Sequence, residues 1–195
     1  MGLTWSESGL RALALAAALI ASLGAAEAAS LAERIEACAA CHGAGGASTM
    51  ENIPSLAGQP EFFVMNQLIL MREGVRRVEP MTDVVKDLKD EDILALAAHF
   101  AKAPPARTPE PVDAARAAAG APLAETLRCA SCHLPNYGGQ EQIPRLAGQR
   151  VDYMIAAMKA YRDNTRSGAD TQMAAVVYGL TDAQIEALAH YASSK

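Results

Sequence analysis

The sequence predicts an all-α protein made of two tandem domains, and three observations support this fold class. Apolar residues recur at the three- and four-residue spacing of helices, and no segment shows the alternation typical of a strand. The two halves align with each other at an offset of about ninety residues, which indicates a duplicated domain. A proline-rich stretch lies between the halves, and prolines favour an extended, semi-rigid connector over a helix.

The first 29 residues are predicted to be a signal peptide for export. Arg11 precedes a short apolar run, and small residues follow this run up to Ala29. The alternative is a retained membrane anchor, but the apolar run is shorter than the about 20 residues that span a bilayer. We therefore expect cleavage near Ala28 or Ala29 and a periplasmic mature protein.

Residues 30–103 form the predicted N-terminal domain, with three helices. The first covers Leu31–Cys41. The second covers Pro60–Gly74, opening on a proline and closing on a glycine, as helices commonly do. The third covers Asp90–Lys102, with an acidic first turn and an apolar stripe at helical spacing.

Residues 104–112 form the predicted linker, and 113–195 form the C-terminal domain. Its predicted helices repeat those of the first domain and cover Leu123–Cys132, Gln149–Arg162 and Thr181–Ala192. Thr181 is a natural N-cap for the last one, because its hydroxyl can accept from an unsatisfied backbone N–H.

A five-residue motif, Cys-x-x-Cys-His, occurs once in each domain, at Cys38–His42 and Cys129–His133. This is the attachment signature of c-type haem. On a helix the two cysteines share one face, so both thiols can bond to the vinyl groups of one porphyrin. The predicted cofactors are therefore two covalently bound haem c groups, attached through all four cysteines of the chain: Cys38, Cys41, Cys129 and Cys132.

The histidine of each motif, His42 and His133, is the predicted fifth ligand of its iron. The sixth ligand could be Met, His or Lys, or the position could be open. Met81 and Met173 align across the repeat, 39 residues after His42 and 40 after His133, and both precede the last helix. A single Met is usually core filler, but one repeated at the same place in two haem domains predicts a ligand.

The other histidines and methionines are predicted to play structural roles. His99 and His190 do not align with each other, so we expect late-helix positions near a favourable helix dipole. Met50 and Met154 also lack a repeated counterpart and are assigned to the core or the surface.

Two other uses of the cysteines fit the pattern less well. A structural zinc site needs four ligands, and each domain supplies three, with the histidine directly beside the second cysteine. An exported protein with four cysteines also suggests disulfides, but a disulfide framework does not require a histidine after each pair.

The sequence resembles the dihaem class I cytochromes c of the cytochrome c4 type. The shared motifs are the two haem signatures, the two Pro-x-Leu-Ala-Gly-Gln segments that begin at Pro54 and Pro144, the stretch from Gln67 to Arg76, and the two aligned methionines. The resemblance implies two cytochrome c-like domains with His/Met ligation. It also implies hydrogen bonds from the inner nitrogens of His42 and His133 to the carbonyls of Pro54 and Pro144.

These features predict a periplasmic carrier of single electrons rather than an enzyme. With both axial positions filled, neither iron has room for a small-molecule substrate. The formal net charge of −5 argues against nucleic acid and favours redox proteins with basic docking faces. The resemblance implies a quinol-oxidising complex and a membrane oxidase as partners, docked transiently. The alternatives are the haem subunit of a dehydrogenase, such as a flavocytochrome that oxidises sulfide, and a dihaem enzyme.

Overall fold

The computed structural model describes residues 29–107, 109–166, 168 and 171–195. The predicted signal peptide, apart from its last residue, therefore lies outside the described residues. Leu31–Lys195 form one unit of helices and loops, and the one β pairing in its described part is an isolated bridge between Gln140 and Ile143. The all-α prediction is confirmed. Of the described helices, none has both the length and the apolar character needed to cross a membrane.

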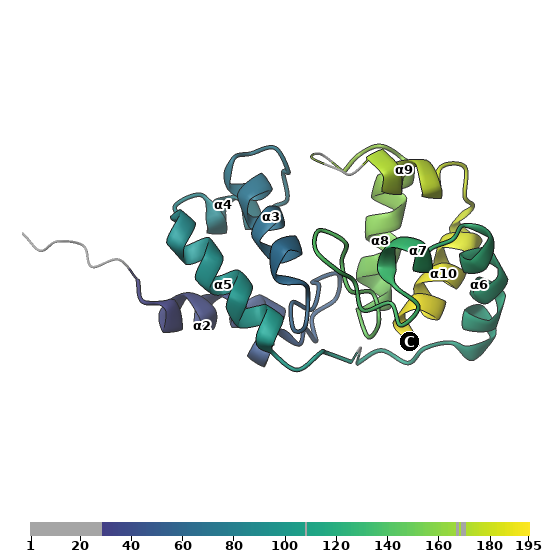
Figure 1. Ribbon diagram of the computed structural model, residues 1–195, viewed down its shortest axis with the longest axis horizontal. Coiled ribbons are helices and arrows are strands. Elements are labelled where there is room, and N and C mark those ends of the chain that lie inside the picture. Colours follow the sequence, from purple (N-terminus) through teal and green to yellow (C-terminus); the bar gives the residue numbers. More distant parts are fainter. Residues whose placement is uncertain (1–28, 108, 167, 169–170) are drawn as a thin grey trace, which may run out of the picture. The chain divides into compact units, whose positions relative to one another are not determined.

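The first half of this unit contains four α-helices and one short 3₁₀ helix (Figure 1). They are α2 (Leu31–His42), η1 (Ala44–Gly46), α3 (Glu61–Arg72), α4 (Met81–Val85) and α5 (Asp90–Lys102). The helices predicted over residues 31–41, 60–74 and 90–102 are present, and α4 was not predicted.

The second half repeats the plan with one helix more. Its helices are α6 (Ala114–Thr126), α7 (Ala130–His133), α8 (Val151–Arg162), α9 (Thr171–Val177) and α10 (Asp182–Ser193). Thr181 is the N-cap of α10: its hydroxyl accepts from Gln184 N, and the Gln184 side chain accepts from Thr181 N, as predicted.

One predicted helix, Leu123–Cys132, is wrong as a continuous element. Helix α6 begins earlier, at Ala114, where the Asp113 side chain accepts from two backbone N–H groups, and it ends at Thr126. Arg128 has φ 57°, a left-handed conformation that interrupts the helix before α7. No glycine or proline marks this break in the sequence, so local propensity did not reveal it.

The two halves pack their helices in the same way. In the first half, α3 contacts α4 and α5, and α2 contacts α5. In the second half, α8 contacts α9 and α10, and α6 contacts α10. Gly120 lets α6 approach α10 closely, because a Cβ there would overlap the carbonyl of Ala187. The internal repeat of the sequence is therefore also a repeat of the packing.

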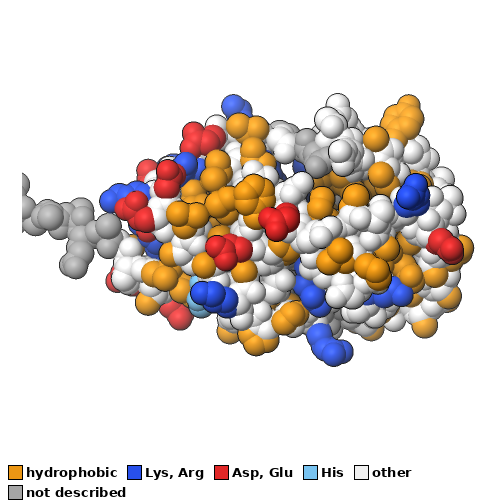
Figure 2. All heavy atoms as spheres, in the orientation of Figure 1, with side chains coloured by type: hydrophobic (Ala, Val, Ile, Leu, Met, Phe, Trp, Pro, Cys, Tyr) orange, Lys and Arg blue, Asp and Glu red, His pale blue; other side chains and the backbone are white. Residues whose placement is uncertain are grey.

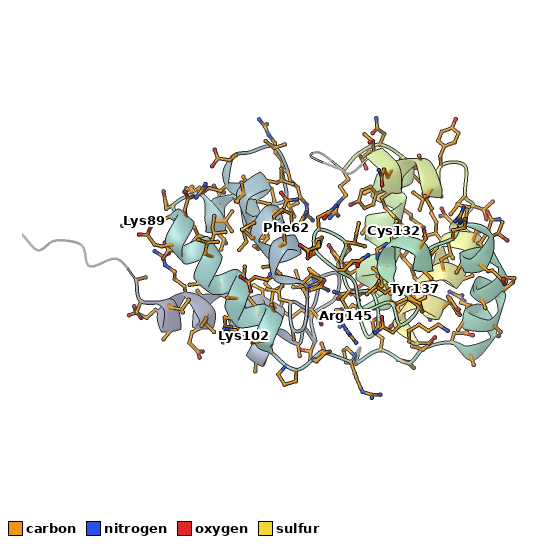
Figure 3. All side chains as sticks on the ribbon, in the orientation of Figure 1. Phe62, Lys89, Lys102, Cys132, Tyr137 and Arg145 are labelled. Atoms are coloured by element: carbon orange, nitrogen blue, oxygen red, sulfur yellow. The ribbon has the colours of Figure 1, made fainter. Side chains whose placement is uncertain are left out.

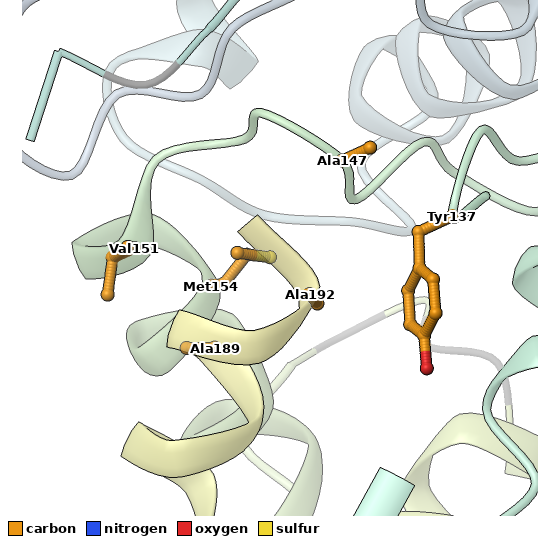
Figure 4. Close-up of a cluster of buried hydrophobic side chains, with 6 residues drawn as sticks. All are labelled: Tyr137, Ala147, Val151, Met154, Ala189 and Ala192. Atoms are coloured by element: carbon orange, nitrogen blue, oxygen red, sulfur yellow. The ribbon is translucent and has the colours of Figure 1, made fainter. Parts of the chain in front are cut away.

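Each half buries one face of its last helix. Ile93, Leu96 and Phe100 of α5 are at most 2% exposed. In the second half, Ala189 and Ala192 of α10 pack against Met154 and Val151 of α8, with Tyr137 and Ala147 from the preceding loop completing the cluster (Figure 4). Met154 is thus a core residue and Met50 is exposed, in agreement with the prediction for these two methionines.

Candidate functional site

Each cysteine pair lies at the end of a helix, directly before its histidine. Cys38 and Cys41 lie on the last turns of α2, and Cys129 precedes α7. Cys132 lies on α7 (Figure 3). None of the four is in a disulfide, and in each pair the first cysteine is partly buried and the second is exposed. Burial raises the pKa of Cys38, partly offset by Arg34, and it also raises the pKa of Cys129.

Each histidine of the two motifs is buried and held by one hydrogen bond. His42 Nδ1 lies 2.8 Å from the carbonyl oxygen of Pro54, and His133 Nδ1 lies 2.9 Å from that of Pro144. A carbonyl oxygen only accepts, so Nδ1 carries the proton and Nε2 keeps its lone pair for a metal. The hydrogen bonds implied by the family resemblance are confirmed.

The surroundings of these two histidines favour the neutral imidazole. Burial lowers the pKa of His42 below its ordinary value, and the hydrogen bond to Pro54 offsets part of this effect. The pKa of His133 is lowered by burial in the same way, with Pro144 opposing. Both shifts favour, at neutral pH, the uncharged form that coordinates metals.

The backbone turns sharply after each histidine. Gly43 has φ 80° and Leu134 has φ 68°, both in the left-handed region. A short loop then leads to a carbonyl that accepts two N–H groups from the proline segment. Gly46 O accepts from residues 56 and 57 at 2.8 and 3.1 Å, and Tyr137 O accepts from residues 146 and 147 at 2.9 and 3.0 Å. These bonds join each proline segment to the loop that follows its histidine.

The two predicted methionine ligands lie on short helices next to the last helix of each half. Met81 is the first residue of α4, and Met173 is the third residue of α9; both are partly buried. Helix α4 packs on α3, and α3 on α5, which in turn contacts the histidine-bearing helix α2. In the first half, the histidine-bearing helix α2 therefore contacts α5, and the methionine-bearing helix α4 contacts α3.

Matching arginines anchor the segments that follow these methionines. Arg72 Nη1 donates to the Leu88 carbonyl at 3.1 Å, and Arg162 Nη1 donates to the Leu180 carbonyl at 3.1 Å. The same guanidinium groups form ion pairs with Asp90 and Asp182, at the start of the last helix of each half. The two methionine segments are therefore held by the same contacts.

The remaining histidines have structural surroundings. His190 Nδ1 accepts the Asp113 backbone N–H at 3.2 Å, and the His99 ring lies edge-on to Phe100. Both lie in the last turn of their helices, as expected. Within the part of the chain that the structure describes, no three His, Cys, Asp or Glu side chains gather as a metal-binding group.

A basic cluster that was not predicted lies where the two halves meet. Arg76 and Arg166, which are equivalent in the repeat, both hydrogen-bond Tyr153. Burial alone would raise the pKa of Tyr153, but the two guanidinium groups outweigh it and lower that pKa. Arg76 also donates to Gln67 Oε1 at 2.6 Å, and Arg166 lies over the Tyr161 ring at 4.8 Å. The internal repeat could have revealed this pair, because Arg76 and Arg166 lie at the ninety-residue offset that also relates Pro54 to Pro144.

This cluster fits an anionic group. Arg76 is 8% exposed, and its Nε atom is buried without a hydrogen-bond partner among the described residues. After burial, the groups that most affect the pKa of Arg76 and Arg166 include the tyrosines Tyr153 and Tyr161, and no carboxylate is among these largest contributions. Each haem c carries two propionate carboxylates, which can supply the missing negative charge. The cysteines, the neutral histidines and this cluster are therefore compatible with bound haem.

Comparison with known proteins identifies both halves. Residues 117–194 match the family model "Cytochrome c", and residues 24–100 match "Cytochrome C oxidase, cbb3-type, subunit III". The chain is 36% identical over 171 residues to the "Thiosulfate dehydrogenase electron acceptor" of Thiomonas intermedia, covering 81% of this chain and 78% of the relative. It is 34% identical over 163 residues to the "Cytochrome c4" of Pseudomonas aeruginosa, covering 79% and 81%.

A solved structure agrees with these relatives. The reduced recombinant cytochrome c4 from Pseudomonas stutzeri superposes with a TM-score of 0.75 at 29% identity, covering 86% of this chain and 99% of that one. The two cysteine pairs lie one in each matched domain, so the chain carries two covalently bound haem c groups. This protein belongs to the dihaem electron-carrier cytochromes c of the cytochrome c4 type.

Proposed function

We propose that this protein is a periplasmic carrier that passes single electrons between redox proteins, and that it is not an enzyme. In this proposal His42 and Met81 ligate one iron, and His133 and Met173 ligate the other. The observation that carries the proposal is the duplicated histidine, buried, neutral and bonded through Nδ1 to a proline carbonyl in both halves.

The histidines are prepared to bind iron without rearrangement. The hydrogen bond at Nδ1 fixes the ring orientation and the tautomer, and it raises the basicity of Nε2. Because the same bond occurs at 2.8 and 2.9 Å in the two halves, we assign both histidines the same role.

The repeat also supports the two methionines as sixth ligands. Met81 and Met173 lie on helices that pack equivalently, and both segments are anchored by an arginine bonded to a backbone carbonyl. Neither Met50 nor Met154 has an equivalent methionine in the other half; Met154 lies in the core of the second half, and Met50 is 47% exposed.

The cofactor supplies a one-electron Fe(III)/Fe(II) couple, and the residues around it set its potential. A thioether ligand in place of a second imidazole raises the reduction potential. Two strong ligands from the chain also exclude exogenous ligands, which suits electron exchange and leaves no position for a substrate.

A redox titration of the holoprotein with optical and magnetic spectra tests this function. We expect two haems per chain, low-spin iron, and a near-infrared sulfur-to-iron charge-transfer band. Ready binding of carbon monoxide to the reduced protein at neutral pH would contradict closed coordination and would favour a dihaem enzyme.

The periplasmic location rests on the predicted signal peptide, residues 1–29. We also propose that the mature chain consists of domains 30–103 and 113–195 joined by the linker 104–112. N-terminal sequencing of the haem-containing protein from a periplasmic fraction is expected to begin near Ala29 or Ser30. A mature protein that retains Arg11 and stays with the membrane would contradict export with cleavage.

Two kinds of electron donor remain candidates. The first is a quinol-oxidising complex, with a membrane oxidase as acceptor. The second is a dehydrogenase, which the relative named "Thiosulfate dehydrogenase electron acceptor" favours. Stopped-flow reduction of the oxidised holoprotein by each donor separates them: the physiological donor reduces it faster, and the rate falls with ionic strength where charges steer docking.

The accessible surface of the first half contains apolar side chains that a partner can cover. Phe62, Val84 and Leu94 are 47, 54 and 51% exposed, and Figure 2 shows hydrophobic side chains gathered on the drawn face of this half. Acidic and basic side chains also lie on this face. Such a mixture suits short-lived docking between redox proteins.

A further inference from the structure

Two glutamines at the same position of the repeat reach across to the opposite half. Gln149 Oε1 accepts from Ser55 N at 2.8 Å, and Gln149 Nε2 donates to Ser55 O at 2.9 Å. In the reverse direction, Gln59 Oε1 accepts from Arg145 N at 3.0 Å, and Gln59 Nε2 donates to Arg145 O at 2.9 Å. Arg145 is labelled in Figure 3, on a loop that follows α7. Each side chain thus holds both backbone groups of one residue in the other half.

The residues that they hold are adjacent to the prolines of the haem sites. The N–H of Ser55 and the carbonyl of Pro54 belong to one peptide group, and so do the N–H of Arg145 and the carbonyl of Pro144. The carbonyl of each group accepts from a histidine Nδ1, at 2.8 Å from His42 and 2.9 Å from His133. One rigid, planar group therefore bonds to a histidine of its own half and to a glutamine of the other half.

The two glutamines and Ser55 are shielded from water: Gln59, Gln149 and Ser55 are 4, 5 and 3% exposed, whereas Arg145 is partly buried. In such an environment hydrogen bonds polarise one another through the peptide group. An acceptor on the N–H makes the carbonyl of the same group a stronger acceptor, which strengthens its bond to the imidazole N–H.

We propose that Gln59 and Gln149 are crossed positioning residues: each one fixes and polarises the peptide that orients the haem-binding histidine of the opposite half. The inference rests on the proposed ligation by His42 and His133. Its consequence is that contact between the halves tunes the electron donation of both imidazoles. Gln149 acts on the first haem although it belongs to the second half, and Gln59 acts on the second haem.

The sign of the effect follows from the hydrogen-bond chain. A stronger bond at Nδ1 gives the imidazole more anionic character, which stabilises Fe(III) and lowers the reduction potential. Gln149→Met keeps the side-chain length but removes the acceptor, so it is expected to raise the midpoint potential of the first haem and leave the second unchanged. Gln59→Met is expected to do the reverse.

The experiment is a redox titration of each holoprotein. The titration is monitored by NMR, which detects the hyperfine-shifted methyl signals of each haem. Cys38→Ser, which breaks one thioether of the first haem, assigns the signals to the two haems. Gln184→Met makes the same chemical change at the exposed start of α10 and is expected to leave both potentials unchanged. Gln149→Glu keeps an oxygen acceptor for Ser55 N–H, so it is expected to hold the first potential at or below the wild-type value.

The outcomes separate this inference from the ligation on which it rests. Hyperfine-shifted ring signals of His42 and His133 in the wild-type protein establish ligation, and their absence overturns both claims. When those signals are present, three results overturn the inference. Each Met variant could shift the potential of the haem in its own half, shift both potentials equally, or shift neither potential. If the Met variants do not retain haem, the Gln149→Glu protein provides the test: a rise in the midpoint potential of its first haem also overturns the inference.

Discussion

The Nδ1 atom of His42 lies 2.8 Å from the carbonyl oxygen of Pro54, and these two residues are separated by twelve positions in the chain. The bond joins the end of α2 to the loop that precedes α3, so folding of that loop orients the imidazole. His133 and Pro144 repeat the bond in the second half. The two halves therefore contain two sites with the same hydrogen bond, each next to a cysteine pair.

Met81→Ala is expected to abolish the sulfur-to-iron charge-transfer band of one haem and to lower one of the two midpoint potentials, because the thioether ligand is lost. Near-infrared spectra and a redox titration measure both effects. Met50→Ala, at an exposed methionine, is the control and is expected to change neither. A Met81→Ala protein that keeps the full band would exclude Met81 as a ligand, and the same test applies to Met173.

Cys132→Ser is expected to leave the second haem attached by one thioether, through Cys129, or to release it. Mass spectrometry of the denatured protein and the haemochrome spectrum report the number of haems and of thioether bonds. Ser131→Ala, one position earlier on α7, is the control and is expected to retain both haems fully bound. Two fully attached haems in Cys132→Ser would refute covalent attachment through this residue.

Arg76→Leu is expected to lower at least one midpoint potential, because a buried cation near the cofactor stabilises the reduced form, which carries one negative charge more. It is also expected to cost about 3–5 kcal/mol of stability if the guanidinium pairs with a buried carboxylate in the holoprotein. Arg77→Leu makes the same charge change at the next, exposed residue. Equal effects of the two variants on the potentials would show that the cluster has no special role.

The N-caps of the two last helices offer a reciprocal pair of stability changes. Thr181→Ala removes the cap of α10 and is expected to destabilise the protein by about 1 kcal/mol. Lys89 precedes α5 with φ −80° and ψ 167°, close to the −72° and 160° of Thr181, but its side chain cannot accept a hydrogen bond. Lys89→Thr is therefore expected to stabilise the protein by roughly 0.5–1 kcal/mol.

Denaturant unfolding of the holoprotein, followed by far-UV circular dichroism, measures both changes. Ser194→Ala, at the opposite end of α10, is a control for the removal of a hydroxyl group from this helix. A destabilised Lys89→Thr variant would show that the lysine makes contacts worth more than the new cap.

Stability in acid is expected to depend on Asp182. Lys159 and Arg162 lie 2.7 and 2.6 Å from its carboxylate and lower its pKa below the ordinary value of 3.8. A carboxylate with a lowered folded-state pKa stabilises the protein above pH 3.8, and this contribution is lost as the pH falls through the folded-state pKa. Asp182→Asn removes the contribution, so wild type and variant are expected to converge in stability only below that pH.

Urea unfolding at several pH values tests this dependence. Asp87→Asn makes the same charge change at an exposed loop residue and serves as the control. A difference between wild type and Asp182→Asn that is the same at pH 2 and at neutral pH would rule out the ion pair as its source.

Much of the architecture was predictable because the chain contains the same domain twice. Local patterns were sufficient for α3, α5, α8 and α10, whose apolar faces and end residues are readable in the sequence. The break between α6 and α7 was not readable. It occurs at Arg128, where a left-handed conformation is unfavourable in isolation and persists only because the surrounding packing holds it.

The haem motifs, the matched methionines proposed as ligands and the two proline segments could all be identified from the sequence, because covalent attachment and coordination require particular residue types at short or repeated spacings. Only the tertiary structure brought Arg76 to Arg166 and Tyr153, and placed Gln59 and Gln149 against the proline peptides of the opposite halves. The hydrogen bonds of these two glutamines join residues 94 and 86 positions apart. No local pattern encodes such a contact, because it depends on how the two halves pack against each other.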